Sequence, residues 1–246
     1  MCSFDYAVII PAWNEAEYIE SSVGSAVSAM RSQAFNGQLI VVDNNSTDNT
    51  AELAELAGAV VVFEPVNQIS RARNAGANGS SARWLVFVDA DTVLTAELLE
   101  RALDLLSSNK VVGGGAWIAP DRSIAWLAML SLRGWNRVAS LFKLAAGCFV
   151  FCRADAFEQV GGFSLKRYAG EELVLSRALR RWGRKKNMGF IIIKQPSIVT
   201  SVRKIDWFSG RQLLSQYVFA LIPGAMRSKR AMSTWYDEST KRTKKK

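Results

Sequence analysis

Two aspartates separated by a single residue follow a strongly apolar segment in the first half of the chain. Asp89 and Asp91 come directly after the run 84–88, which contains only Trp, Leu, Val and Phe. Carboxylates this close repel each other, and burial at the end of a core strand increases the repulsion. A divalent cation that prefers oxygen ligands, Mn²⁺ or Mg²⁺, relieves it. We therefore expect Asp91 and Asp89 to bind a metal ion that holds a diphosphate. The alternative is that Asp91 only caps a helix starting near residue 95.

Polar residues also follow two earlier apolar runs, 6–10 and 39–42. Asp43 ends the second run, where its carboxylate can accept hydrogen bonds from a base or a ribose, whereas helix capping accounts better for Asp48 and Thr50. On a helix expected over 70–77, Arg71 and Arg73 cannot share one face, and Arg73 is the candidate for a phosphate or base contact. The first run is followed by a turn whose candidate nucleotide-binding residues are Pro11, Ala12, Trp13 and Glu15.

The elements that must position these residues alternate between strands and helices. Short, continuous, β-branched runs at 6–10, 39–42, 60–63 and 84–88 are typical of strands buried on both faces of a parallel sheet, and helical patterns separate them at 15–29, 49–57 and 70–77. Ligands bind beyond the carboxyl ends of such strands. After residue 95 the order is mixed. We expect helices over 95–106, 123–144, 154–160 and 171–182, and strands over 111–118, 148–152 and 189–194.

Taken in their order along the chain, the motifs resemble those of the family 2 glycosyltransferases, which have the GT-A fold. The resemblance covers residues 5–205 and includes a PxxNE turn after the first strand, a VDDGSxD-like segment, an ARNxG helix, a DxD metal motif, a GGF segment and an EDxxLSxR-like helix. These correspond to residues 11–15, 41–48, 72–76, 89–91, 161–163 and 171–177. The resemblance implies an α/β fold with a mostly parallel nucleotide-binding sheet flanked by helices and a mixed acceptor-binding half. The sequence pattern adds a helical, basic C-terminal tail.

The resemblance also implies an inverting transfer from a nucleotide sugar, with a UDP-sugar favoured, to an acceptor hydroxyl such as that of a glycan. The apolar stretch 213–226 and the basic tail suggest a lipid-linked acceptor. Carried over by position, the catalytic base is Glu172, where the family usually has Asp, and Glu171 is the second choice. The opposing interpretation is that both only favour a helix start. Arg203 is the candidate for a diphosphate contact, with an ordinary solvated charge as its alternative. Many relatives add a histidine ligand to the metal, and this chain has no histidine.

The charge distribution sets further expectations. The net charge is +9, and residues 203–246 hold eleven Lys or Arg against three Asp or Glu. We expect a nucleotide-sugar-binding half (1–110), an acceptor-binding half of the same domain (111–205) and an amphipathic segment with a basic tail (206–246). The tail and the apolar stretch 213–226 suggest peripheral contact with an anionic membrane, and a solvated terminus is the alternative. The Trp-rich helix at 123–144 is expected to be a core helix with a charged outer stripe.

Composition, motifs and charge distribution bear on the cellular location and disfavour several other classes of protein. Three sparse cysteines, no leader-like start and no apolar run of about 20 residues favour a cytoplasmic protein. With the membrane contact suggested above, we expect it at the inner face of the membrane. A nucleotidyltransferase or a dinucleotide oxidoreductase would need a Gly-rich loop after the first strand. A nucleic-acid-binding protein is disfavoured because the basic residues collect at one end. A catalytically inactive sugar-nucleotide-binding protein remains the main alternative.

Overall fold

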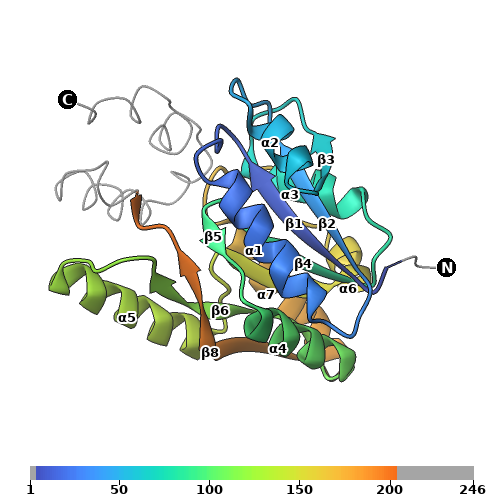
Figure 1. Ribbon diagram of the computed structural model, residues 1–246. Coiled ribbons are helices and arrows are strands. Elements are labelled where there is room, and N and C mark those ends of the chain that lie inside the picture. The colour runs from blue at the N-terminus through green and yellow to red at the C-terminus, as the bar shows by residue number, and fades with distance from the viewer. Residues whose placement is uncertain (1–3, 204–246) are drawn as a thin grey trace.

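The computed structural model describes residues 4–203, which form a single eight-stranded sheet with helices on both faces (Figure 1). The strand order is β3-β2-β1-β4-β7-β6-β8-β5. The expected tail, 206–246, lies outside the described residues. The strands are β1 (Tyr6–Ala12), β2 (Gly37–Asp43), β3 (Val60–Phe63), β4 (Trp84–Val88), β5 (Thr92–Val93), β6 (Val111–Pro120), β7 (Phe149–Arg153) and β8 (Gly189–Thr200).

The first four strands of this order are parallel, as the sequence predicts. Alternate side chains of β1 serve two separate cores: Val8 and Ile10 pack on one face of the sheet, and Ala7 and Ile9 on the other. Both faces are therefore apolar, which explains why the strand reads as a continuous hydrophobic run. Because these strands run in one direction, their carboxyl ends meet at one edge of the sheet.

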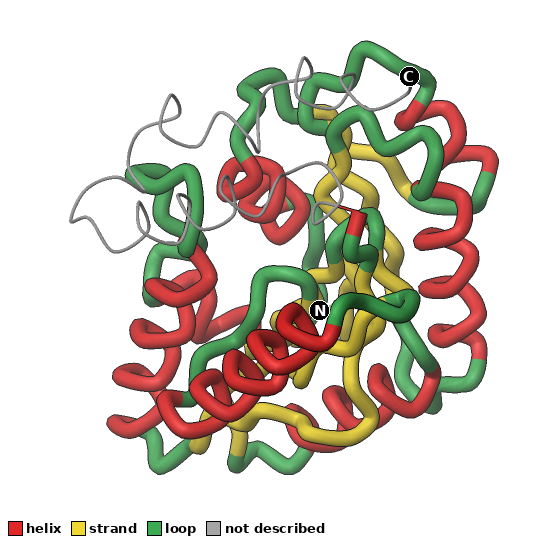
Figure 2. The backbone as a smooth tube through the Cα atoms, turned by 90° about the vertical axis from the view of Figure 1, so that its left-hand side faces the viewer, coloured by secondary structure: helices red, strands yellow, loops and turns green. Residues whose placement is uncertain are grey.

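The helices form a layer on each face, and the strands lie between them (Figure 2). The first core includes residues of α1, α2 and α4, and the second includes residues of α3, α6 and α7. The helices are α1 (Ile19–Arg31), α2 (Thr50–Leu56), α3 (Ile69–Asn78), α4 (Ala96–Ser107), α5 (Trp126–Phe142), α6 (Ala154–Gln159) and α7 (Glu171–Lys185). The prediction of a helix from residue 15 was wrong at its start, because residues 13–18 form the turn after β1.

The second half of the sheet is mixed, as expected. Strand β7 is antiparallel to β4 and β6, and β8 is parallel to β6 and antiparallel to β5. The sequence missed the short strand β5 and ended β8 too early, at residue 194. Its continuation to Thr200 pairs Val199 with Val93 and brings the end of β8 beside the two aspartates. The two halves of the domain thus share one sheet.

Glycines allow the close approaches that this packing requires. A Cβ added to Gly76 in α3 would lie 2.4 Å from the Ile9 side chain, so this glycine lets α3 lie directly on β1. The run Gly113–Gly115 is enclosed in the same way between β7 and β8, where a Cβ on Gly114 would lie 2.0 Å from the carbonyl oxygen of Ile191. The glycine run therefore serves sheet packing.

Helix α5 contradicts the expectation of a core helix. Only Asn136 and Ala139 are buried along its length, and the Asn136 amide bonds both the N–H and the carbonyl of Ile118 in β6, at 3.0 and 2.9 Å. The rest of the helix projects from the body of the molecule (Figure 1). Among the described residues, no helix combines the length and apolarity that crossing a bilayer demands.

Candidate active site

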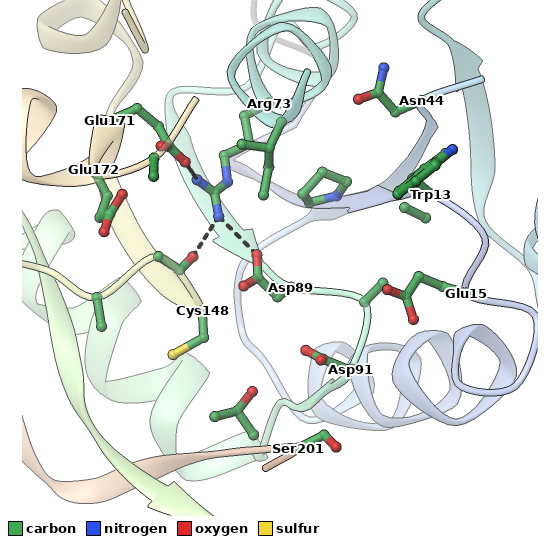
Figure 3. A pocket seen from close by; sticks show the side chains of 18 of the residues that line it. Trp13, Glu15, Asn44, Arg73, Asp89, Asp91, Cys148, Glu171, Glu172 and Ser201 are labelled. Atoms are coloured by element: carbon green, nitrogen blue, oxygen red, sulfur yellow. Dashed lines mark hydrogen bonds and ion pairs between the residues drawn. The ribbon is translucent and has the colours of Figure 1, made fainter. Parts of the chain in front are cut away.

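A cavity of about 400 Å³ opens at the carboxyl ends of β1 and β4. Its walls come from the turn after β1, the start of α3, the end of β4, the segment before β7, the start of α7 and the end of β8 (Figure 3). The structure brings together nearly all of the predicted site residues. Those lining the cavity are Pro11, Ala12, Trp13, Glu15, Arg73, Asp89, Asp91, Glu171, Glu172 and Arg203.

Asp43 is the predicted site residue outside that lining. Its side chain is buried and accepts a hydrogen bond of 3.1 Å from the backbone N–H of Ser46. The next residue, Asn44, lines the cavity instead. The Asn44 amide group donates to the carbonyl oxygens of Glu64 and Val66, and its oxygen accepts from the N–H of Gln68 at 2.8 Å. Asn44 thereby holds the segment that leads into α3.

The polar run after β2 fixes the turn after β1. The Ser46 hydroxyl accepts the N–H of Asn14 at 3.0 Å, and the Thr50 hydroxyl accepts the N–H of Glu15 at 2.8 Å. The capping prediction was wrong for Thr50, whose hydroxyl serves the turn. Asp48 does accept the N–H of Thr50 near the start of α2, at 3.1 Å. The run therefore positions Trp13 and Glu15 on the cavity wall.

Arg73 is the centre of a buried ionic network. Its guanidinium donates to Glu171 at 2.6 Å, to Asp89 at 2.8 Å and to the carbonyl oxygen of Gly147 at 2.9 Å (Figure 3). The residue is 1% exposed. These bonds join the tip of β4, the segment before β7 and the start of α7. The arginine predicted to bind a ligand is thus bonded to protein groups instead, and it links the cavity wall at β4 to the wall at α7.

The start of α7 presents its two glutamates differently. Gly170, at φ 69°, precedes the helix in a left-handed conformation that suits glycine. Glu171 is buried against Arg73, whereas Glu172 is half-buried and has no ion pair within the described residues. Burial raises the pKa of Glu172 to about 8, the Glu171 carboxylate adds to the rise, and Arg73 opposes it. A helix start alone would lower this pKa, so burial and the neighbouring carboxylate outweigh the helix start at Glu172.

The approach to α7 is held by hydrogen bonds between two of the motif segments. The Asn74 side chain accepts the N–H of Phe163 and donates to the carbonyl oxygen of the same residue, both at 2.9 Å. The Gln68 side chain donates to the carbonyl oxygens of Leu165 and Arg167, also at 2.9 Å. Helix α3 thus positions both Arg73 and the loop that delivers the glutamates.

Arg203 connects the two ends of the described chain. One of its guanidinium nitrogens lies 2.5 Å from Glu15 and 3.1 Å from Asp91, and its guanidinium carbon lies 4.3 Å from the centre of the Tyr18 ring. The backbone N–H of Ser201 donates to the carbonyl oxygen of Asp91 at 3.0 Å. The end of β8 is thereby joined to the acidic tip of β4.

The cavity carries an excess of acid. Five carboxyl groups and two guanidinium groups line it, so a nucleoside diphosphate alone would meet net repulsion. A divalent cation at Asp91 and Asp89 would offset that charge. No group of three His, Cys, Asp or Glu suited to a metal occurs among residues 4–203. The aspartates nevertheless fit Mg²⁺ or Mn²⁺, which bind through one or two carboxylates when phosphate and water complete the shell.

Sequence reasoning missed several lining residues, among them Asn44, Gly147, Cys148 and Tyr168. Tyr168 lies just before α7, and Gly147 and Cys148 lie just before β7. Their positions next to the ends of expected elements could have marked them as candidates for the cavity wall. Burial raises the pKa of the Cys148 thiol, with Asp89 and Asp91 adding to the effect, which keeps it protonated in the ligand-free cavity.

Comparison with known proteins agrees with this geometry. The family described as "Glycosyl transferase family 2" matches residues 7–161. Glycosyltransferase AglE of Haloferax volcanii is 32% identical over 168 residues, which cover 64% of this chain and 55% of AglE. WfgD of Escherichia coli, whose name describes a UDP-Glc:α-D-GlcNAc-diphosphoundecaprenol β-1,3-glucosyltransferase, is 26% identical over 43% of this chain and 42% of its own. The chain thus spans about half the length of these relatives.

Solved structures share the fold at low sequence identity. Glucosyl-3-phosphoglycerate synthase from Mycobacterium tuberculosis, in complex with Mg²⁺ and UDP, gives a TM-score of 0.63 at 18% identity over 90% of this chain and 79% of that one. TarS of S. aureus with UDP-GlcNAc gives 0.62 at 16% identity, covering 91% and 66%. The mannosyltransferase PcManGT from Pyrobaculum calidifontis, with GDP-Man and Mn²⁺, gives 0.60 at 18% identity, covering 96% and 70%. The α/β fold is that of these GT-A enzymes.

Proposed function

Because this chain belongs to glycosyltransferase family 2, we propose that it transfers a sugar from a nucleoside-diphosphate sugar to an acceptor hydroxyl with inversion at the anomeric carbon. The observation that carries this proposal is the arrangement of carboxylates in one cavity. Asp89 and Asp91 stand at the tip of β4, and Glu172 stands on the wall formed by α7 (Figure 3). A donor held by the aspartates would thus have its sugar between them and a base.

Glu172 is the proposed base. It takes the proton of the acceptor hydroxyl as that oxygen attacks the anomeric carbon from the face opposite the diphosphate. Its raised pKa makes it a stronger base than an ordinary carboxylate, provided that it is ionised. Glu171 is a poorer candidate because Arg73 holds its carboxylate at 2.6 Å. We assign Glu171 and Arg73 to the positioning of α7 and Asp89.

On the donor side, Asp91 and Asp89 would hold the divalent cation. When bound, that cation neutralises the diphosphate and stabilises its departure. Arg203 is proposed to turn from Asp91 toward the diphosphate, since its planar guanidinium suits phosphate oxygens. The contact between Arg203 and Glu15 keeps the arginine at this end of the cavity before the donor arrives.

The nucleoside is proposed to lie at the turn after β1. Trp13 gives this wall a flat aromatic surface, and Pro11, Ala12 and Asn44 line the same region. Asp43, which the sequence assigned to the base or ribose, holds Ser46 through one carboxylate oxygen, and the other oxygen is the candidate for that contact. UDP is the favoured nucleotide, supported by the UDP and UDP-GlcNAc bound to two of the structural neighbours, while PcManGT makes GDP the comparison to test.

The acceptor is proposed to be lipid-linked, with peripheral contact between the protein and an anionic membrane. The support is the name of WfgD, which describes an acceptor attached to diphosphoundecaprenol, and the positive charge of this chain. A glycan acceptor without a lipid is the alternative, and it should be compared with a lipid-linked acceptor in the transfer assay.

The proposal is tested by metal-dependent transfer or hydrolysis of UDP-, GDP- and dTDP-sugars. Glu172→Gln should lower turnover by about 10²–10⁴-fold and leave the affinity for UDP with Mn²⁺ unchanged. Asp91→Asn should weaken that affinity and its response to chelators. Glu20→Gln is the matched control, because Glu20 also lies in the first turn of a helix but is exposed and outside the cavity. Unaltered turnover in Glu172→Gln would remove the base assignment.

A catalytically inactive sugar-nucleotide-binding protein is the second candidate. Glutamate at 172 and the lack of histidine favour it, since both depart from the usual family pattern. It predicts that UDP binds with Mn²⁺ but that no nucleotide sugar is hydrolysed or transferred, with or without lipid-linked acceptors.

A further inference from the structure

Helix α5 exposes an apolar stripe along its whole length. Leu127, Leu130, Val138 and Leu141 are all exposed, and together with Gly134 they follow one another at intervals of three or four residues, which places them on one face. Leu141 alone is 76% exposed. Trp126 and Phe142 stand exposed at the two ends of the helix. Leaving this much apolar surface in water is unfavourable, so the stripe indicates a surface that is covered when the protein works.

Positive charge borders the stripe. Arg133 and Arg137 are exposed and lie one helical turn apart along one edge, and Lys143 follows the helix. The sequence from 122 to 154 contains no Asp or Glu. A helix with an apolar face, basic residues at its edge and a tryptophan at its end has the pattern of one lying in the interface of a bilayer. The arginine stems can follow the apolar surface while their charges reach lipid phosphates.

We propose that α5 is a docking helix that lies in the surface of an anionic lipid bilayer with its leucine stripe toward the acyl chains. The helix has 17 residues, or about 25 Å, and is suited to lying along the surface. An anionic surface is favoured over a protein partner because the rim carries only positive charge, and the chain as a whole is at +9.

The docking helix is physically continuous with the cavity. Asn136 bonds the backbone of Ile118, whose side chain lines the cavity, and the segment that follows α5 supplies Ala146, Gly147 and Cys148 to its wall. A membrane in contact with α5 would therefore bring lipid-linked hydroxyls near Glu172. This purpose rests on the proposed transfer reaction. The contact of α5 with the bilayer assigns the membrane contact proposed above to one helix, and it can be tested without any transfer.

Vesicle partitioning of the full chain tests the proposal. The double variant Leu130→Glu/Leu141→Glu replaces two leucines of the stripe, and Leu56→Glu in α2 is the matched control, because Leu56 is 77% exposed and lies outside α5. With vesicles of phosphatidylcholine and phosphatidylglycerol, the double variant should lose binding by about thirty-fold, from two leucines transferred from water to lipid. Leu56→Glu should bind as the wild type does.

A second measurement places α5 in the lipid. Brominated lipids should quench the fluorescence of Trp126, seen as the difference between the wild type and Trp126→Phe. Wild-type protein that stays off anionic vesicles, a double variant that binds as well as Leu56→Glu, or an unquenched Trp126 would overturn the proposal. So would a double variant that only converts a dimer to monomers, since the stripe would then join two copies.

Measurements without vesicles keep the two proposals separate. Circular dichroism and the affinity for UDP with Mn²⁺ should be the same in all three proteins, because neither Leu130 nor Leu141 lines the cavity. Loss of vesicle binding at unchanged UDP affinity supports the docking helix. Absent UDP binding with intact, α5-dependent vesicle binding would refute the proposed function alone.

Discussion

Replacing Glu172 by glutamine should stabilise the protein at alkaline pH, even though it is expected to lower the proposed turnover. The native structure holds this carboxyl beside Glu171 in a poorly solvated cavity, and the pKa rises from 4.5 to about 8. In the unfolded chain the same group has its ordinary pKa. Ionised Glu172 therefore costs folding free energy, and an uncharged side chain of the same shape removes that cost.

The sign and size follow from proton linkage. Between pH 4.5 and about 8 the native state retains a proton that the unfolded state has released, so stability falls as the pH rises through this window. One pKa unit corresponds to about 1.4 kcal/mol, and the whole shift would give more than 4 kcal/mol with fixed surroundings. Because the half-buried carboxyl can turn toward water, we expect roughly 2–3 kcal/mol at pH 9.

Urea denaturation of the ligand-free protein at pH 6 and pH 9 measures this effect. At pH 6 the native wild type keeps the proton that its unfolded state has released, so Glu172→Gln should already be the more stable protein, by less than half of the difference expected at pH 9. At pH 9 the variant should be more stable by the stated amount, and Glu20→Gln should match wild type at both values. A difference that is independent of pH, or a variant less stable at pH 9, would refute the electrostatic account of Glu172.

Two further predictions concern packing around α3. Arg73→Met should lower the free energy of unfolding by about 3–5 kcal/mol, because it leaves the buried Glu171 and the half-buried Asp89 without their cation. Arg71→Met on the same helix should cost under about 1 kcal/mol, and equal losses in urea denaturation would contradict the network. Gly76→Ala should lower the melting temperature, because the added methyl group clashes with Ile9 and lowers the free energy of unfolding by about 1–3 kcal/mol. Gly24→Ala should raise the melting temperature, because Gly24 has open space around it and alanine favours a helix. A rise for both would show that α3 can shift.

The central strands and their tips could be predicted because they depend on local pattern. Continuous apolar runs identify strands buried on both faces, and chain direction then places Asp89, Asp91 and the turn after β1 at one edge. That Glu172 lines the same cavity followed from the family resemblance, since spacing alone favoured a helix start. The fold class and the family were confirmed, and the roles of individual residues stay predictions.

The features that the sequence missed depend on long-range contacts. Strand β5 has two residues, too few for a periodic signal, and exists because β8 pairs with it. The apolar pattern of α5 shows that one face differs from the other, but it does not say what covers either face. In the structure the inner face is held through the polar Asn136, and the leucines point outward.

The bond between Arg203 and Glu15 joins residues 188 positions apart in the sequence. A nascent chain that has left the ribosome only as far as residue 161 already contains the whole region matched by the family, yet it lacks α7 and β8. The order of synthesis thus makes strands β1 to β4 first, Glu172 later, and β8 with Arg203 last. A chain cut at this point lacks the cavity walls that α7 and β8 supply, so we expect incomplete products of translation to be without the proposed transferase activity.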